Sequence, residues 1–166
     1  MSVRGHSPRT QASNNLVAFV VADTLYAVDI HRVQEIVQPL AVAPLPSAPA
    51  FVLGLADYRG AIIPVVDLAA RMGAVRTRPA KRSRWIVVRS AAGIVGLVVD
   101  EVRDVFLAAD ADHGTVPPLS GGAMERGIVS ACRRAAGLVF VLDVDRVLGP
   151  LLELGSVRAF ASTVGS

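Results

Sequence analysis

The sequence predicts an all-β protein made of two copies of one small barrel, and three observations support this. Hydrophobic residues make up 52% of the chain but aromatic residues only 5%, because valine, alanine and leucine dominate. Short apolar runs alternate with glycine, proline and polar turns, a pattern typical of short strands. The chain also repeats itself. Strands this short cannot leave edges open in so small a unit, so each copy is expected to close into a five-stranded barrel.

The internal repeat consists of two matched blocks. Residues 26–37 align with residues 95–106 at a shift of 69, which places Val33 over Val102. Residues 62–73 align with residues 138–149 at a shift of 76, because the connection between the blocks is longer in the second copy. A single barrel of this size buries too little apolar surface to be stable alone. We therefore expect the two copies to pack together with a groove between them.

The first repeat follows a polar segment, residues 1–15, which lacks periodicity and is expected to be a disordered arm. Strands are predicted at residues 16–21 and 25–30, joined by a tight turn. The alternation breaks over residues 33–37, which indicates either the end of a strand or one helical turn. Four prolines then exclude helix and central strand from the crossover that follows: Pro39, Pro44, Pro46 and Pro49.

The most distinctive turn of the sequence is Asp57-Tyr58-Arg59-Gly60, which two β-type runs flank. The second run, residues 61–66, is apolar at nearly every position, so both of its faces are expected to be covered. Asp67 stands where a helix N-cap is expected, and Gly73 where that short helix ends. Arg59 is a lone cation in this apolar neighbourhood. From spacing alone it either faces water at a turn or makes a specific contact.

The second repeat is predicted to follow the same order. Its elements are a hairpin at 84–89 and 94–99, a loop at 108–126, strands at 128–133 and 138–142, and a helix capped by Asp143 that ends near Gly149-Pro150. The expected organisation is one domain over residues 16–154. Its first barrel covers about 16–75 and its second about 84–150, and the two barrels can exchange strands. A C-terminal tail follows at 155–166.

The charge balance does not indicate a nucleic-acid-binding protein. The net charge is +3 and the pI is near 9.7, but the chain also has 14 acidic residues. Basic residues gather in the loop 76–84, where Trp85 at the end is the nearest aromatic residue. This pattern favours a solvated connection over a nucleic-acid patch.

Nothing in the sequence predicts an enzyme, a metal site or a cofactor. The single Cys132 permits neither an intramolecular disulfide nor a thiol–metal cluster, and we expect it in the core or on a strand surface. The three histidines have no ligand-spaced partners, and no phosphate-binding glycine loop is present. Asp67 and Asp143 occupy equivalent places in the two repeats, which indicates helix caps, since a catalytic residue need not be duplicated.

The sequence also predicts no membrane insertion. No apolar run approaches the roughly 20 residues of a membrane helix, and the first 15 residues are not a secretory signal. We therefore expect a cytoplasmic protein.

Four motifs taken together resemble the CheW family, the coupling proteins of bacterial chemosensory arrays. They are VQEI at 33–36, GLADYRG at 54–60, IPVVDL at 63–68 and GLVVDEV at 96–102. The resemblance covers about residues 16–152. It implies two intertwined SH3-like barrels that bind the cytoplasmic tip of a chemoreceptor in the groove between them. It also implies that one barrel face docks the regulatory domain of a sensor histidine kinase.

Carried over by position, the resemblance implies a set of receptor-groove residues. They are Val33, Glu35, Gly54, Asp57, Tyr58 and Arg59. We expect Glu35 to pair with Arg59 and to fix its guanidinium beside the groove, a contact that matters more for orientation than for net stability. The family usually has asparagine at position 57 and often an aliphatic residue at 58. A carboxylate at Asp57 can compete with Glu35 for Arg59 or repel an acidic receptor helix.

The leading hypothesis is a non-enzymatic adaptor that couples chemoreceptors to a histidine kinase. The alternative is an accessory paralogue that binds the receptor or another adaptor but not the kinase. A nucleic-acid-binding double barrel that uses the 76–84 loop is a third hypothesis. The start at Met1 leads us to expect a whole protein over a fragment of a kinase or of a larger fusion.

Overall fold

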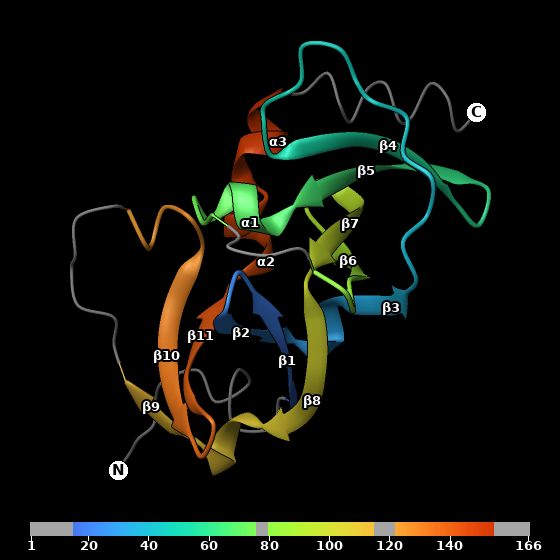
Figure 1. Ribbon diagram of the computed structural model, residues 1–166. Coiled ribbons are helices and arrows are strands. Elements are labelled where there is room, and N and C mark those ends of the chain that lie inside the picture. Colours follow the sequence, from blue (N-terminus) through green and yellow to red (C-terminus); the bar gives the residue numbers. More distant parts are fainter. Residues whose placement is uncertain (1–14, 76–79, 115–121, 155–166) are drawn as a thin grey trace.

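The computed structural model describes residues 15–75, 80–114 and 122–154, and its strands form two sheets (Figure 1). The predicted arm, apart from Asn15, and the tail at 155–166 lie outside the described residues, as do residues 76–79 of the basic loop. The all-β fold class that the sequence predicts is confirmed.

The two repeats share five strands and a capped helix, and they differ in their other elements. The first has β1 (Asn15–Val21), β2 (Thr24–Asp29), the 3-10 turn η1 (Ile30–Arg32), β3 (Val33–Val37), β4 (Val52–Tyr58), β5 (Ala61–Asp67) and α1 (Leu68–Arg71). The second has β6 (Arg84–Ser90), β7 (Gly93–Val99), β8 (Glu101–Leu107), the 3-10 turn η2 (Ala108–Asp110), β9 (Asp112–Gly114), β10 (Ile128–Arg134), β11 (Gly137–Leu142), α2 (Val144–Val147) and α3 (Gly149–Leu154). The internal repeat therefore holds for the five main strands and the capped helix, whereas β9, α3 and the places of the 3-10 turns distinguish the two copies.

The structure settles or corrects several local predictions. Of the two alternatives for residues 33–37, the strand is confirmed, and a helical turn lies just before it in η1. The predicted loop 108–126 contains β9, a strand with no β-forming residues that exists because it pairs with β10 at Cys132↔His113. The helix capped by Asp143 ends at Val147, close to the predicted end near Gly149-Pro150, but a further helix, α3, begins at Gly149 and was not predicted; Pro150 lies in its first turn, where a missing N–H costs nothing.

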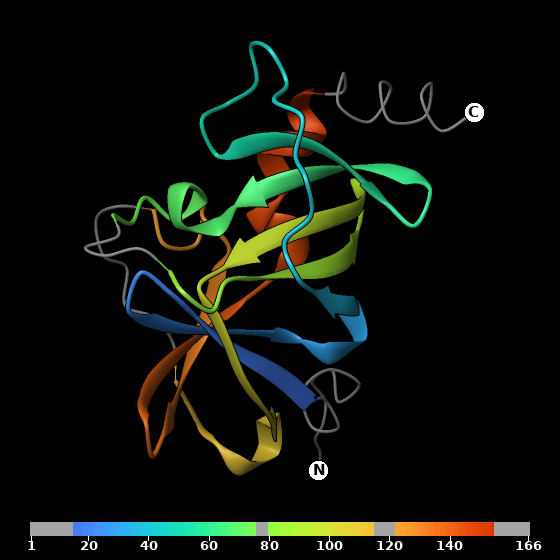
Figure 2. The ribbon, with the colours of Figure 1, turned by 45° about the vertical axis from the view of Figure 1, so that its right-hand side comes forward.

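The strands are exchanged between the repeats. One sheet, here sheet A, has the order β8-β1-β2-β11-β10-β9, and the other, sheet B, has the order β3-β6-β7-β5-β4. Each sheet thus takes the first hairpin of one repeat and the later strands of the other, as Figure 2 shows where β8, in yellow, runs beside the blue β1. The ranges 16–75 and 84–150 mark the repeats and not the sheets. The short β9 adds a sixth strand to sheet A.

Apolar side chains form one core between the sheets and further cores within each barrel. We call the barrels that sheets A and B form barrel A and barrel B. Along β1, Val17 and Phe19 face the shared core, whereas Leu16 and Ala18 face the inside of barrel A. Along β5, Val66 likewise joins the shared core. This two-residue period explains why these strands are apolar on both faces. Because the shared core takes residues from both sheets, neither barrel keeps its packing without the other.

Short-range features follow the sequence closely. The carboxylates of Asp67 and Asp143 accept hydrogen bonds from backbone N–H groups at the starts of α1 and α2, as predicted for N-caps. Cys132 is 1% exposed inside barrel A, and burial raises the pKa of its thiol. Among the described residues, no helix is long and apolar enough to cross a bilayer.

Candidate protein-interaction site

Sheet B has two edge strands, β3 and β4, and polar side chains connect the middle of β3 to the end of β4. A bulge in β3 between Val33 and Glu35 changes the direction of the side chains, so Val33 packs on the shared core while Val37 faces the inside of barrel B. Glu35 is two residues before Val37, so its side chain leaves the strand on the same side as that of Val37, at the opening of barrel B. The strand therefore delivers a carboxylate to the end of β4.

At the end of β4, a two-residue turn presents Arg59. Tyr58 pairs with Ala61, which leaves Arg59 and Gly60 as the loop, with φ of +52° and +85°. Such a hairpin turn requires positive φ at both positions, and an arginine there is strained by about 1–3 kcal/mol. Asp57 supports the turn, because its Oδ1 accepts a hydrogen bond of 2.9 Å from Gly60 N.

Glu35, Tyr58 and Arg59 form a closed group, here called the Glu35 cluster. Arg59 donates from Nε to Glu35 Oε1 at 2.9 Å and from Nη2 to Oε2 at 2.5 Å. The Tyr58 hydroxyl donates to Glu35 Oε1 at 2.6 Å, and the Arg59 guanidinium lies 5.6 Å from the centre of the Tyr58 ring. The predicted pairing of Glu35 with Arg59 is therefore present, as a two-pronged contact.

Hydrogen bonds from Arg59 and then from Tyr58 lower the pKa of Glu35 to about 2. The same contact with Glu35 raises the pKa of Arg59. A carboxylate held in this way stays ionised at neutral pH and is a poor base. The cluster is thus suited to presenting fixed charge and not to proton transfer.

The cluster is rigid at its base and open to solvent at its tip. The Tyr58 residue is 5% exposed and its ring packs with Ile63 and Val87, whereas the Arg59 side chain is 67% exposed and that of Glu35 is 32% exposed. The sequence allowed Arg59 either to face water or to make a specific contact, and in the structure it does both. A surface cation with a fixed direction is a feature of a recognition site.

Of the remaining predicted site residues, Asp57 adjoins this cluster, whereas Val33 and Gly54 have other surroundings. Asp57 is exposed and directed to the turn backbone, so it does not take Arg59 from Glu35. Val33 is half-buried against the shared core. Gly54 is buried with φ of +149°, and a Cβ built on it would lie 2.1 Å from Ala43 O of the proline-rich crossover. Gly54 is thus the point of close approach between β4 and the crossover.

Sequence reasoning missed a counterpart of the cluster in barrel A. Asp104 occupies the position of Glu35 in the second repeat, and Arg134 occupies that of Tyr58. Arg134 forks onto Asp104 at 3.2 and 3.0 Å, which lowers the pKa of Asp104, and its guanidinium lies 3.9 Å from the centre of the Phe106 ring. The alignment of the two repeats could have revealed this pair, because it places an acidic residue over Glu35 and a basic residue over Tyr58. A cavity of about 270 Å³ opens beside it, lined by Ala18, Leu25, Arg103, Asp104, Arg134, Ala135 and Ala136.

The described residues contain no group of three acidic, histidine or cysteine side chains that could hold a metal ion. The fold and the site together define a class of protein, a double barrel that presents fixed charge on its surface.

Comparison with known proteins gives the family. A model of the CheW-like domain matches residues 15–150, and the chain therefore belongs to the CheW-like family, as its motifs had indicated. This is a family of non-enzymatic scaffold and adaptor proteins of chemotaxis.

Individual relatives agree with this assignment. A chemotaxis protein CheW of Rhizobium meliloti is 35% identical over 141 residues, which cover 83% of this chain and 89% of that protein. FrzA of Myxococcus xanthus is 28% identical over 131 residues, 77% of this chain and 81% of the relative. The crystal structure of the scaffolding protein TtCheW from Thermoanaerobacter tengcongensis superposes with a TM-score of 0.71 at 27% identity, over 82% of this chain and 92% of that one.

Proposed function

We propose that this protein couples chemoreceptors to a sensor histidine kinase, and that the Glu35 cluster contacts the cytoplasmic tip of the receptor. The observation that carries the proposal is the exposed Arg59 guanidinium, held in one direction by Glu35 while its backbone is in a strained turn. Strained, over-determined residues of this kind gather at functional sites. A structural turn alone has no need of an arginine here, because glycine or asparagine fits it better.

The geometry also supports a role for the neighbouring residues. Gly54 keeps the crossover close to β4, and Asp57 closes the turn, so both hold Arg59 in place without needing to touch a partner. The kinase regulatory domain would then bind elsewhere on the barrels. A protein of this class works in the cytoplasm, where receptor tips and kinase are both present, and it needs no cofactor.

The proposal is tested by calorimetric titration with two partners from the same genome. One is a soluble fragment of a chemoreceptor's cytoplasmic tip, and the other is the regulatory domain of a histidine kinase. The proposal predicts that the wild-type protein binds both, and that Arg59→Ala abolishes receptor binding but leaves kinase binding and the circular dichroism spectrum unchanged. Equal receptor affinity of the wild-type and Arg59→Ala proteins would contradict the site assignment.

Arg82→Ala provides a matched control. Arg82 is another exposed arginine, 77% accessible, with an ion pair of 3.6 Å to Glu101. Its removal changes the net charge as much as Arg59→Ala does. Arg82 is not part of the Glu35 cluster, because it precedes β6 and pairs with Glu101 in β8 of sheet A. We expect this variant to bind both partners like the wild-type protein.

The same titration separates the alternatives. Binding to the receptor but not to the kinase would identify an accessory adaptor. Binding to neither, with steeply salt-dependent binding to DNA or RNA, would instead support a nucleic-acid-binding double barrel.

A further inference from the structure

The chain passes from one sheet to the other twice. An ion pair between Arg32 and Asp145 lies at the first passage, and the second passage has no equivalent pair among the described residues. The first passage runs from β2 in sheet A to β3 in sheet B through η1, and the second runs from β7 to β8. Arg32 is the last residue of η1, three positions before Glu35. Its side chain reaches Asp145 on α2, the helix that follows β11 of sheet A.

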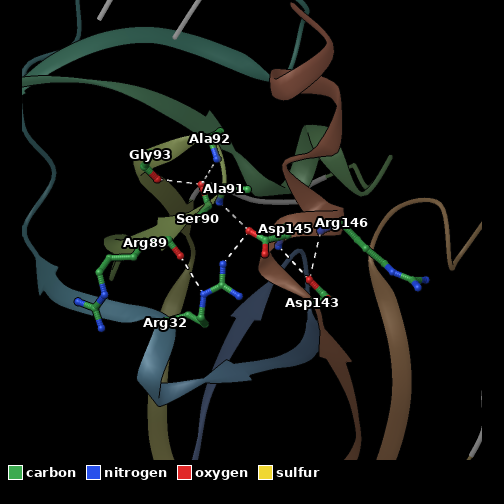
Figure 3. Close-up of polar contacts among 9 residues, drawn as sticks. All are labelled: Arg32, Arg89, Ser90, Ala91, Ala92, Gly93, Asp143, Asp145 and Arg146. Carbon is green, nitrogen blue, oxygen red and sulfur yellow. Dashed lines mark hydrogen bonds and ion pairs between the residues drawn. The ribbon is translucent and has the colours of Figure 1, made fainter. Parts of the chain in front are cut away.

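The contacts of Arg32 join three segments that are distant in sequence (Figure 3). Arg32 Nη2 donates to Asp145 Oδ1 at 2.6 Å, and Arg32 Nε donates to Arg89 O of β6 at 3.0 Å. The same Asp145 Oδ1 accepts from Ala91 N in the β6–β7 hairpin at 2.8 Å. The carboxylate thus ties α2, which follows β11 of sheet A in the chain and packs against β6 of sheet B, to the β6–β7 hairpin and to the start of β3.

At the second passage, the repeat positions carry different residues. Glu101 replaces Arg32, and the buried Ala69 replaces Asp145. Glu101 forms ion pairs with Arg103 at 3.2 Å and with Arg82 at 3.6 Å. A carboxylate also accepts from the amide of the first hairpin, but from another repeat position: Ala22 N donates to Asp100 Oδ2 at 2.9 Å, and Asp100 aligns with His31. The double-barrel plan therefore needs a carboxylate on each hairpin amide, but it does not need the arginine.

We infer that Arg32 and Asp145 form a latch that fixes sheet B relative to sheet A and so positions β3 and Glu35 for the partner. β3 is an edge strand that pairs along one side only, with β6, so its start depends on contacts such as those of Arg32. The side chains of Arg32 and Asp145 are 33% and 41% exposed, so the pair contributes little to the free energy of unfolding. Its main effect is to fix the orientation of the segments that it joins. Arg32 is thus a positioning residue, and this part of the inference rests on the proposed function.

A distance measurement tests the latch without any partner. Nitroxide labels are placed on cysteines introduced at Leu53 in β4 and Leu138 in β11, two exposed positions on different sheets. Pulsed electron resonance then gives the distribution of distances between the sheets. We expect Arg32→Gln to broaden this distribution, whereas the control Arg103→Gln, which removes an ion pair at the second passage, leaves it unchanged. An unchanged distribution in Arg32→Gln overturns the latch.

A binding measurement on unlabelled protein tests its consequence. Arg32→Gln is expected to lower affinity for the receptor-tip fragment roughly threefold to tenfold, with affinity for the kinase regulatory domain unchanged. Asp145→Asn should have a similar effect, and the double variant should be no worse than either single one. Equal losses for both partners would indicate general destabilisation and overturn the positioning role. If the wild-type protein binds no receptor, the proposed function fails, and the distance measurement alone decides the latch.

Discussion

The close approach at Gly54 makes a quantitative prediction about stability. In Gly54→Ala, a methyl group must be placed at φ of +149°, 2.1 Å from Ala43 O. The backbone strain costs about 1–3 kcal/mol. The displaced crossover also loses the paired hydrogen bonds between Ala43 and Leu55, of 2.8 and 2.9 Å, at about 0.5–1.5 kcal/mol each. The total, about 2–6 kcal/mol, is a large part of the roughly 5–15 kcal/mol by which domains are stable.

Urea unfolding followed by the fluorescence of Trp85, which is 2% exposed inside barrel B, measures this loss. Gly137→Ala is the matched control, because Gly137 has φ of +125° but nothing within 4 Å of a built Cβ. The control keeps the strain and omits the collision, so Gly54→Ala should lose about 1–3 kcal/mol more. Equal losses in the two variants would refute the close approach. Gly54 would then be free to act as a residue that lines the partner surface.

Three further predictions concern single groups. Because the folded pKa of Glu35 is about 2 and its ordinary value is 4.5, its contribution to stability is present above pH 4.5 and is lost as the pH falls towards 2. The urea midpoint of the wild-type protein should therefore fall more steeply in that range than that of Glu35→Gln, and parallel curves would contradict the assignment. Asp143→Ala removes the N-cap of α2 and should cost about 1 kcal/mol, seen as a melting temperature lowered by about 2–4 °C. The thiol of Cys132 should react with a thiol reagent when the protein is unfolded in about 8 M urea, but not in the folded protein in buffer. Fast labelling of the folded protein would contradict the burial of Cys132.

Features that depend on neighbouring residues could be predicted from the sequence. The hairpins, the caps at Asp67 and Asp143 and the repeat itself follow from alternation, turn residues and self-alignment. The exchange of strands could not be fixed in this way. The parallel pairs that create it, β2 with β11 and β5 with β7, join strands that are apolar on both faces, so their alternation is the same whichever barrel they enter.

The candidate site shows the same division. The pairing of Glu35 with Arg59 could be expected from the resemblance and from the chemistry of a carboxylate and a guanidinium. The Tyr58 hydroxyl could not, because its reach depends on the bulge in β3. The pair in barrel A escaped notice because its cation, Arg134, aligns with Tyr58 and not with Arg59.

The central claim, that Arg59 held by Glu35 is the receptor contact of a coupling adaptor, is tested most directly by one titration. The receptor-tip fragment is added to wild-type, Arg59→Ala and Arg82→Ala proteins under identical conditions. We expect the wild-type and Arg82→Ala proteins to bind with the same affinity and the Arg59→Ala protein, still folded, to show no binding. Wild-type affinity in the Arg59→Ala protein would contradict the claim.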